Sequence, residues 1–169
     1  MTILITGGAG YIGSHTLVEL LEQGGSVVER VESITGKKVT FYKGDILDKS
    51  LLKHIFSSHS IDSVIHFAGL KSVGESVTNP IDYYQNNVQG TLTLIEAMRN
   101  ALVFKLVFSS SATVYGDPKY LPIKENSPIG GTTNPYGTSK LMAEMMLRDI
   151  SKSDDRFSFT ILRYFNPVG

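Results

Sequence analysis

The stretch TILITGGAGYIG, residues 2–13, begins as an apolar, β-branched segment and passes at once into a glycine-rich turn. Residues 2–6 have the composition of a strand that is buried on both faces of a sheet. Apolar residues from Ile12 to Leu21 then recur at helical spacing until Gly24-Gly25 ends the pattern. Glycine at positions 7, 10 and 13 allows a tight turn, approach of the backbone to a pyrophosphate and close helix packing. This order predicts a dinucleotide site; the alternative is a turn that only joins two packed elements.

The rest of the chain alternates predicted strands and helices. Crossovers of this length join parallel strands, so we expect an α/β fold with a Rossmann-like doubly wound parallel sheet in one domain, residues 1–169. A second strand with an acidic end, due roughly 20 residues after the glycines, is missing or shortened near residues 25–26. Residues 116–133, rich in Gly, Pro and Asn, form a predicted excursion that can close over a ligand. The further strands are expected near 39–43, 62–67, 105–108 and 157–165, and the further helices near 51–56, 79–98 and 134–150.

Composition narrows the possible partners. Sixteen basic and sixteen acidic residues cancel, and no like-charged run or long apolar segment stands out. We therefore expect no nucleic-acid partner and no membrane surface, and we expect small-molecule ligands. Cysteine is absent, which excludes disulfides and thiol catalysis, and the four histidines lack the spacing of metal ligands, so no metal site is expected. The N-terminus lacks the features of a secretion signal, which favours a cytoplasmic protein.

A tyrosine and a lysine four residues apart form the candidate catalytic pair. Asn134 and Pro135 suit the start of a helix. On that helix Tyr136 and Lys140 share one face, and a neighbouring ammonium favours the phenolate. The pair is therefore a candidate general base; the alternative is a surface tyrosine beside a solvated lysine. The hydroxyls of residues 109–111 follow a predicted strand, where they can hold a substrate oxygen opposite Tyr136.

Other polar residues also follow predicted strands. Asp45 is expected either to reach an adenine or to cap a helix. Lys71 can reach a ribose or a phosphate. His66 is expected to be an interior histidine and not a catalyst. Asn86 and Asn87 are expected on the polar side of the helix that begins near residue 80.

Longer phrases of the sequence resemble the extended short-chain dehydrogenase/reductase family. Together they cover nearly the whole chain. The family continues into a smaller C-terminal domain that grips a nucleotide sugar, and we expect this domain to be absent or truncated here. The second strand and its loop are shorter than the family pattern by about a dozen residues, close to the length of a parallel crossover. The phrases are TGGAGYIGSH (6–15), HFAGLK (66–71), FSSSATVYG (108–116), PYG with SK (135–137 and 139–140) and LRYFNP (162–167).

The resemblance also implies roles for individual residues. Tyr136 is the implied base, Lys140 lowers its pKa and holds the nicotinamide ribose, and Ser111 bonds the sugar hydroxyl. The implied cofactor is NAD. Its implied contacts are Gly7, Gly10, Tyr11, Ile12, Gly13, Asp45, Ile46, Phe67, Ala68, Gly69, Lys71, Asn86, Ser109, Tyr136, Lys140 and Tyr164; the implied substrate contacts are Lys71, Ser111, Thr113, Tyr136, Phe165 and Asn166.

The activity implied by the resemblance is an isomerase reaction in a homodimer: interconversion of UDP-glucose and UDP-galactose by transient oxidation at carbon 4 of the sugar. Three alternatives remain, namely an epimerase for another nucleotide sugar, a nucleotide-sugar dehydratase and a non-catalytic NAD-binding module. A dehydratase needs Asp-Glu where this sequence has Ala112-Thr113. The Ser111, Tyr136 and Lys140 set argues against the module. Without a clear second strand, the sequence does not distinguish NAD from NADP.

Overall fold

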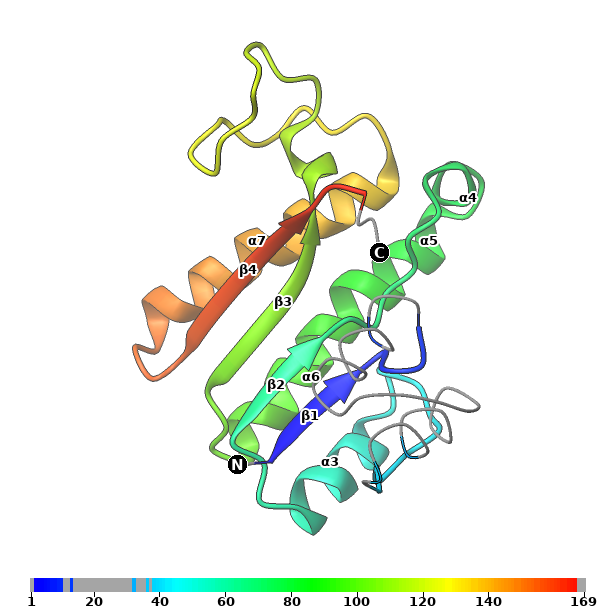
Figure 1. Ribbon diagram of the computed structural model, residues 1–169, viewed down its shortest axis with the longest axis vertical. Coiled ribbons are helices and arrows are strands. Elements are labelled where there is room, and N and C mark those ends of the chain that lie inside the picture. The colour runs from blue at the N-terminus through cyan, green and yellow to red at the C-terminus, as the bar shows by residue number, and fades with distance from the viewer. Residues whose placement is uncertain (1, 11–12, 14–31, 33–35, 37, 167–169) are drawn as a thin grey trace.

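Four parallel strands form one sheet in the computed structural model, which describes residues 2–10, 13, 32, 36 and 38–166 (Figure 1). The strands lie side by side in the order in which they occur along the chain. Their residue pairing is parallel throughout, for example Thr6 with His66 and Ser111 with Tyr164. The carboxyl ends of all four therefore meet at one edge. The strands are β1 (Ile3–Thr6), β2 (Ser63–His66), β3 (Lys105–Ser111) and β4 (Ser158–Tyr164).

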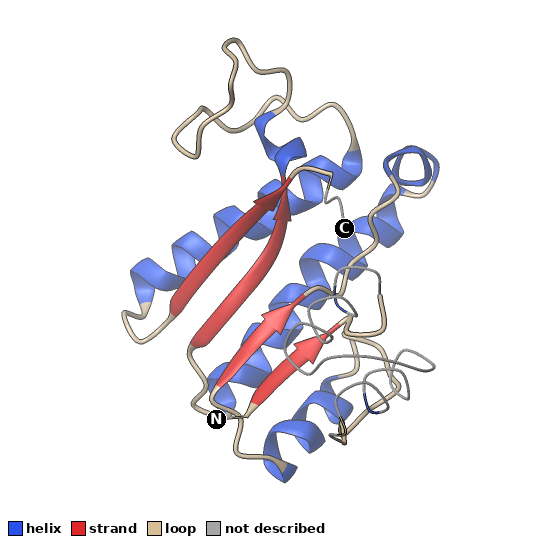
Figure 2. Ribbon diagram, viewed as in Figure 1, coloured by secondary structure: helices blue, strands red, loops and turns tan. Residues whose placement is uncertain are grey.

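Helices α6 and α7 lie behind the sheet, and α3 packs beside α6 (Figures 1 and 2). The parallel α/β prediction is thus confirmed. The helix expected from residue 12 onward lies outside the described residues. No helix of the described chain is both long and apolar enough to cross a bilayer. The helical segments are α3 (Lys49–Ser58), α4 (Val73–Thr78), α5 (Pro80–Tyr83), a π-helical segment (Tyr84–Gln89), α6 (Gly90–Asn100), a 3₁₀ segment (Ala112–Tyr115) and α7 (Pro135–Ser153).

The core lies between β3 and the helices behind it. Leu106 and Phe108 point into it from alternate positions of β3, as the period of a strand requires. Leu94 of α6 and Leu147 of α7 meet them there, both without exposed surface. The alternation continues to Ser110, which is also buried, so the core grades into a polar region at the strand ends.

The start of α7 follows the sequence prediction. The Asn134 side chain accepts a hydrogen bond from the backbone N–H of Gly137 at 2.8 Å, and Pro135 occupies the first turn. The cap fixes where the helix begins, and therefore where Tyr136 and Lys140 stand.

Two predicted elements differ from the structure. Residues 39–43 do not form a strand, because the sequence offers no convincing second strand for them to pair with. The backbone N–H of Val39 donates to the Glu32 carboxylate instead, at 2.8 Å. The single helix predicted over residues 79–98 is a succession of α5, the π-helical segment and α6. Helix α4 was not predicted, because its six residues are too few for a periodic pattern.

Truncation of a core residue in α7 should test this packing. We expect Leu147→Ala to lower the free energy of unfolding by about 2–5 kcal/mol, because it leaves a cavity at a site with no exposed surface. Lys152→Ala, whose parent side chain is 77% exposed in the same helix, should change it by less than about 0.5 kcal/mol. Urea unfolding of both variants measures the difference, and equal losses would contradict the packing described here.

Candidate active site

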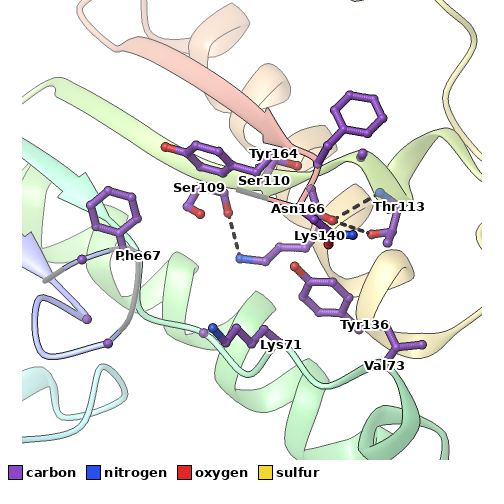
Figure 3. Close-up of a pocket in the computed structure, with 17 residues that line it drawn as sticks. Phe67, Lys71, Val73, Ser109, Ser110, Thr113, Tyr136, Lys140, Tyr164 and Asn166 are labelled. Carbon is purple, nitrogen blue, oxygen red and sulfur yellow. Dashed lines mark hydrogen bonds between the residues drawn. The ribbon is translucent and has the colours of Figure 1, made fainter. Parts of the chain in front are cut away.

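A cavity of about 730 Å³ opens where the four strands end (Figure 3). Each strand contributes to its wall at or just beyond its carboxyl end, which is where parallel α/β sheets bind ligands. Figure 3 shows the Lys140 side chain reaching from α7 toward the end of β3, with the Tyr136 hydroxyl pointing toward it. The lining residues are Gly7, Gly10, Gly13, Phe67, Gly69, Lys71, Val73, Ser109, Ser110, Ser111, Ala112, Thr113, Tyr136, Lys140, Tyr164, Phe165 and Asn166.

The phenol of Tyr136 lies beside the hydroxyl of Ser111. Burial raises the pKa of Tyr136 above its usual value, and a hydrogen bond from Ser111 opposes that rise. The net pKa is raised because desolvation of the phenol outweighs the Ser111 bond, and the lowering by Lys140 that the resemblance implies stays a prediction. Tyr83 packs edge-on against the Tyr136 ring, with ring centroids 6.5 Å apart, and so fixes the ring orientation.

Lys140 is a buried cation at the centre of the wall. Its ammonium donates to the backbone carbonyl of Ser109 at 2.8 Å and lies 5.1 Å from the centre of the Phe108 ring. Burial lowers the pKa of Lys140 to about 8. A fully hydrated lysine would stay protonated to a much higher pH, so this side chain can lose its proton close to neutrality.

A buried carboxylate ties α7 to the strand ends. Glu144 has no exposed surface and accepts hydrogen bonds from Ser110 at 2.6 Å and from Nε and Nη2 of Arg163, both at 2.9 Å. Arg148 adds a further bond at 2.7 Å. Burial would raise the pKa of Glu144, but these bonds and the two guanidinium charges hold it below its usual value. Arg163 also donates to the Tyr115 hydroxyl at 2.9 Å.

His66 is an interior histidine, as predicted. Its Nε2 lies 3.0 Å from the Thr91 hydroxyl, which itself donates to the backbone carbonyl of Asn87 at 2.6 Å. Thr91 therefore accepts from Nε2–H, and Nδ1, 2.6 Å from the Thr6 hydroxyl, accepts the proton of that hydroxyl. Burial, with a smaller contribution from the charge of Lys140, lowers the pKa of His66 to about 3. The ring is thus neutral and joins β2, its own strand, to β1 through Thr6 and to α6 through Thr91.

The turn after β1 requires glycine at its first position. Gly7 has a φ of 69°, and a Cβ there would lie 2.5 Å from the backbone nitrogen of Ala68. Its carbonyl accepts from the N–H of Gly10 at 2.9 Å, which closes the turn. A Cβ on Gly13 would overlap the Gly7 carbonyl oxygen. These close approaches agree with the prediction that the glycines allow a tight turn and close packing.

Most of the predicted site residues meet in this one cavity, but several do not. Asp45, Ile46 and Ala68 line a second cavity of about 620 Å³ that shares Gly7 with the first. Asn86 lines neither of the two, and Tyr11 and Ile12 lie outside the described residues.

The helix-capping alternative for Asp45 is wrong. Its carboxylate accepts from the N–H of Leu47 within a turn at 2.8 Å. Asp48 caps α3 in its place and accepts from the N–H groups of Ser50 and Leu51. The two acidic residues are three positions apart, and only the backbone path decides which of them reaches the free N–H groups.

Three functional residues escaped the sequence reasoning. Asn87 is buried, not on a polar surface, and its amide bonds the N–H and carbonyl of Leu70 at 2.8 and 3.0 Å, which fixes the loop after β2. It stands in a π-helical segment, a feature that often marks functional sites. Glu144 stands four residues after Lys140 on the same helical face, and that spacing was the available signal. Tyr83 carried no signal beyond an apolar pattern.

Comparison with known proteins agrees with this geometry. The model of the NAD dependent epimerase/dehydratase family matches residues 3–169. The chain belongs to this family. The resemblance to extended short-chain dehydrogenases/reductases is thereby confirmed, since the matched region contains the glycine turn, the end of β3 and the start of α7.

Two curated relatives of this epimerase/dehydratase chain carry the same name. The UDP-glucose 4-epimerases of Haemophilus influenzae and Yersinia enterocolitica are 62% and 63% identical over 182 residues, which cover 100% of this chain and 54% of each relative. The chain thus spans about half the length of these curated relatives. The aligned length exceeds the 169 residues of the chain, so the relatives carry positions without counterpart here. This agrees with the expected shortening, whose place near residues 25–26 stays a prediction.

Two solved structures of UDP-glucose 4-epimerases are also similar to this chain. UDP-glucose 4-epimerase from Bifidobacterium longum, in complex with NAD⁺ and UDP, is 53% identical with a TM-score of 0.95. The match covers 100% of this chain and 54% of the Bifidobacterium chain. The enzyme from Stenotrophomonas maltophila, with bound NAD and formylated UDP-arabinopyranose, is 43% identical with a TM-score of 0.93 over the same shares.

The neutral state of His66 should make stability depend on pH. Its pKa of about 3 in the fold lies below the unfolded value of 6.5, so the unfolded chain binds the extra proton as pH falls below 6.5. We expect this group to remove up to about 1.4 kcal/mol of unfolding free energy per pH unit from there toward pH 3. Urea unfolding between pH 7 and 5 measures the slope, compared with His66→Gln and, as control, with the exposed His54→Gln. An equal slope in His66→Gln would contradict the assignment.

Burial of the Lys140 ammonium should cost stability. Below pH 8 the lysine is charged in both the folded and the unfolded chain, and only the folded chain has lost its hydration. We expect Lys140→Met to raise the free energy of unfolding at pH 7 by about 1–3 kcal/mol. We also expect it to abolish the rise in stability that the wild type shows as pH passes from about 8 to 10.5. A less stable variant would show that the Ser109 bond outweighs the desolvation.

Proposed function

We propose that this chain carries the NAD-binding and proton-transfer part of an isomerase that interconverts UDP-glucose and UDP-galactose by transient oxidation at carbon 4 of the sugar. One observation carries the proposal: Tyr136, Ser111 and Lys140 line one cavity at the strand ends of a chain that belongs to the NAD dependent epimerase/dehydratase family. The relatives at 62% and 63% identity are named UDP-glucose 4-epimerase, which supports this substrate class.

The cavity residues fit a dinucleotide. A Cβ on Gly69 would lie 3.1 Å from Oδ1 of Asn87 and 3.3 Å from Nζ of Lys140, so the missing side chain keeps that wall open. The glycine turn after β1 leaves backbone free to approach a pyrophosphate. Phe67 and Lys71 add an apolar surface and a cation. We propose that the adenosine half extends toward Asp45 and Ile46, since their cavity shares Gly7 with the first.

NAD, when bound, would supply the hydride acceptor for the sugar carbon. The phenolate oxygen of Tyr136 then takes the proton of the sugar 4-hydroxyl, and later returns a proton to the same oxygen. Burial raises the pKa of Tyr136, so ionisation of this residue depends on hydrogen-bond donors and cations close to its oxygen. Such a base is active only when the site is assembled.

Lys140 and Glu144 hold this geometry. The ammonium of Lys140 is fixed by the Ser109 carbonyl at 2.8 Å and can offer its remaining protons to a ribose hydroxyl. Glu144 holds α7 to β3 and β4 through Ser110 and Arg163, which keeps Tyr136 facing the strand ends. Pre-organisation of this kind lowers the cost of reaching a reactive geometry.

The dehydratase alternative lacks its carboxylates. The residues after Ser111 are Ala112 and Thr113, and both line the cavity without an acidic group. Elimination of water needs an acid and a base beyond the tyrosine. The choice of UDP-glucose and UDP-galactose over other nucleotide sugars is part of the proposal. The described wall of the cavity ends at Phe165 and Asn166.

We also propose a homodimer. Val77 and Ile81 on the α4–α5 pair and Met142 and Met145 on α7 are exposed apolar side chains on packed helices. Apolar side chains gathered on neighbouring helices suit a helix–helix contact between two copies. A cytoplasmic location also stays a prediction.

Incubation of the full-length protein with UDP-galactose tests the activity. We expect UDP-glucose to form with no added NAD, and we expect denaturation of the purified protein to release NAD. Tyr136→Phe should keep the bound NAD and lose turnover by at least about 100-fold, because the base is gone. Normal turnover in Tyr136→Phe would contradict the proposed base, and release of NADP in place of NAD would contradict the proposed cofactor.

A further inference from the structure

Two hydroxyls at the end of β3 bond to each other. The Ser111 oxygen accepts a hydrogen bond from the backbone N–H of Thr113 at 3.2 Å and a second from the Thr113 hydroxyl at 3.0 Å. Both bonds come from one residue, two positions along the chain, as the backbone turns into the 3₁₀ segment. Ser111 is 8% exposed, and its surroundings are therefore mostly protein.

This arrangement leaves Ser111 with one free hydrogen-bonding function. A serine hydroxyl has two lone pairs and one proton. The two bonds from Thr113 use both lone pairs, so the remaining function is donation of the Ser111 proton. A hydroxyl held in this way can give a hydrogen bond to an oxygen in the cavity, but it has no site left to accept one.

The close packing of α7 on Thr113 decides which group accepts the Ser111 proton. A Cβ on Gly137 would lie 3.2 Å from Cβ of Thr113 and 3.3 Å from both its hydroxyl and carbonyl oxygens, so glycine allows α7 to rest directly on Thr113. Gly137 follows Tyr136, and the contact brings the Tyr136 phenol to Ser111. The bond from Ser111 favours the ionised phenol, as expected when Ser111 is the donor.

We propose that Thr113 is a positioning residue that fixes Ser111 as a hydrogen-bond donor, so that the sugar hydroxyl passes its proton to Tyr136 and never to Ser111. This inference rests on the proposed function, since it deepens the role of that same site. In this proposal Thr113 acts on Ser111, whereas the sequence predicted that Thr113 contacts the substrate. The Thr113 hydroxyl proton is already donated to Ser111.

The proton balance follows directly. The O–H bond of the sugar 4-hydroxyl breaks and an O–H bond forms on the Tyr136 oxygen. When the sugar binds, Ser111 keeps its own proton but turns its one donated hydrogen bond from the Tyr136 oxygen to the sugar oxygen, which becomes a carbonyl oxygen. Donation to an oxygen that gains negative character lowers the barrier in the way an oxyanion hole does.

The test removes the Thr113 hydroxyl and follows the Tyr136 phenol. Thr113→Val keeps the shape of the side chain and the backbone N–H but frees one lone pair of Ser111; Thr113→Ser keeps the hydroxyl. Thr93→Val is the matched control, because the Thr93 hydroxyl of α6 donates to the carbonyl of Gln89, the last residue of the π-helical segment, and neither residue lines the cavity. Phenol ionisation is measured by ultraviolet difference titration, each variant against the same background carrying Tyr136→Phe.

We expect Thr113→Val to move ionisation of the Tyr136 phenol to higher pH and to lower kcat by about three- to tenfold, the usual loss for one uncharged hydrogen bond. Thr113→Ser should restore both values, and Thr93→Val should change neither. In a Ser111→Ala background, Thr113→Val should add no further shift, because Thr113 acts only through Ser111. Thermal unfolding followed by circular dichroism identifies any variant that has lost its fold. If Thr113→Val is such a variant, the phenol titrations of Thr113→Ser and of the Ser111→Ala background provide the test.

Two results would overturn the inference. One is an unchanged phenol titration in Thr113→Val, with or without a loss of kcat, since a loss alone would make Thr113 a direct substrate contact. The other is a full extra shift in the Ser111→Ala background. If the titration shifts as expected while even the wild-type full-length protein fails to epimerise UDP-galactose, the orientation of Ser111 is supported and the proposed function fails.

Discussion

The carboxylate of Glu144 is the contact on which the geometry of the site depends. It is fully buried, and it joins α7 to β3 through Ser110 and to β4 through Arg163. A buried charge is tolerated only when it is paired and hydrogen-bonded, and removal of one partner leaves the other uncompensated. The Arg163 guanidinium continues the network to Tyr115, at the entrance to the 116–133 excursion. These bonds hold the helix that carries Tyr136 against the strand ends.

The site is built at some cost to stability. Lys140 keeps a charged group in a place where burial lowers its pKa to about 8, and burial likewise disfavours ionisation of the Tyr136 phenol. Near pH 7 the phenol is uncharged in both the folded and the unfolded chain, so of the two groups only the Lys140 ammonium lowers the free energy of unfolding that core packing around Leu147 raises. Such conflicts between local chemistry and folding are expected where function is located. The neutral His66 and the Asn87 amide contribute no charge and hold the neighbouring loops in place.

The sequence predicted the parallel fold and most of the wall of the cavity, because both depend on local patterns. The glycine turn, the capped start of α7 and the hydroxyls of β3 each have a signal within a few residues. The failures are non-local. Residues 39–43 have a strand pattern but pair with no strand of the described chain, and the pKa of Tyr136 depends on burial that no spacing reveals. Glu144, Asn87 and Tyr83 act through Arg163, Leu70 and Tyr136, which lie 19, 17 and 53 positions away and which only the fold brings close.

A structure of the full-length protein with NAD and a UDP-hexose tests the central claim most directly. The account predicts that the Tyr136 and Ser111 hydroxyls both lie within about 3.2 Å of the same sugar oxygen, that of carbon 4. It also predicts that Lys140 bonds the ribose beside the nicotinamide. A sugar oxygen held by neither hydroxyl, or a nicotinamide bound away from Lys140, would contradict it.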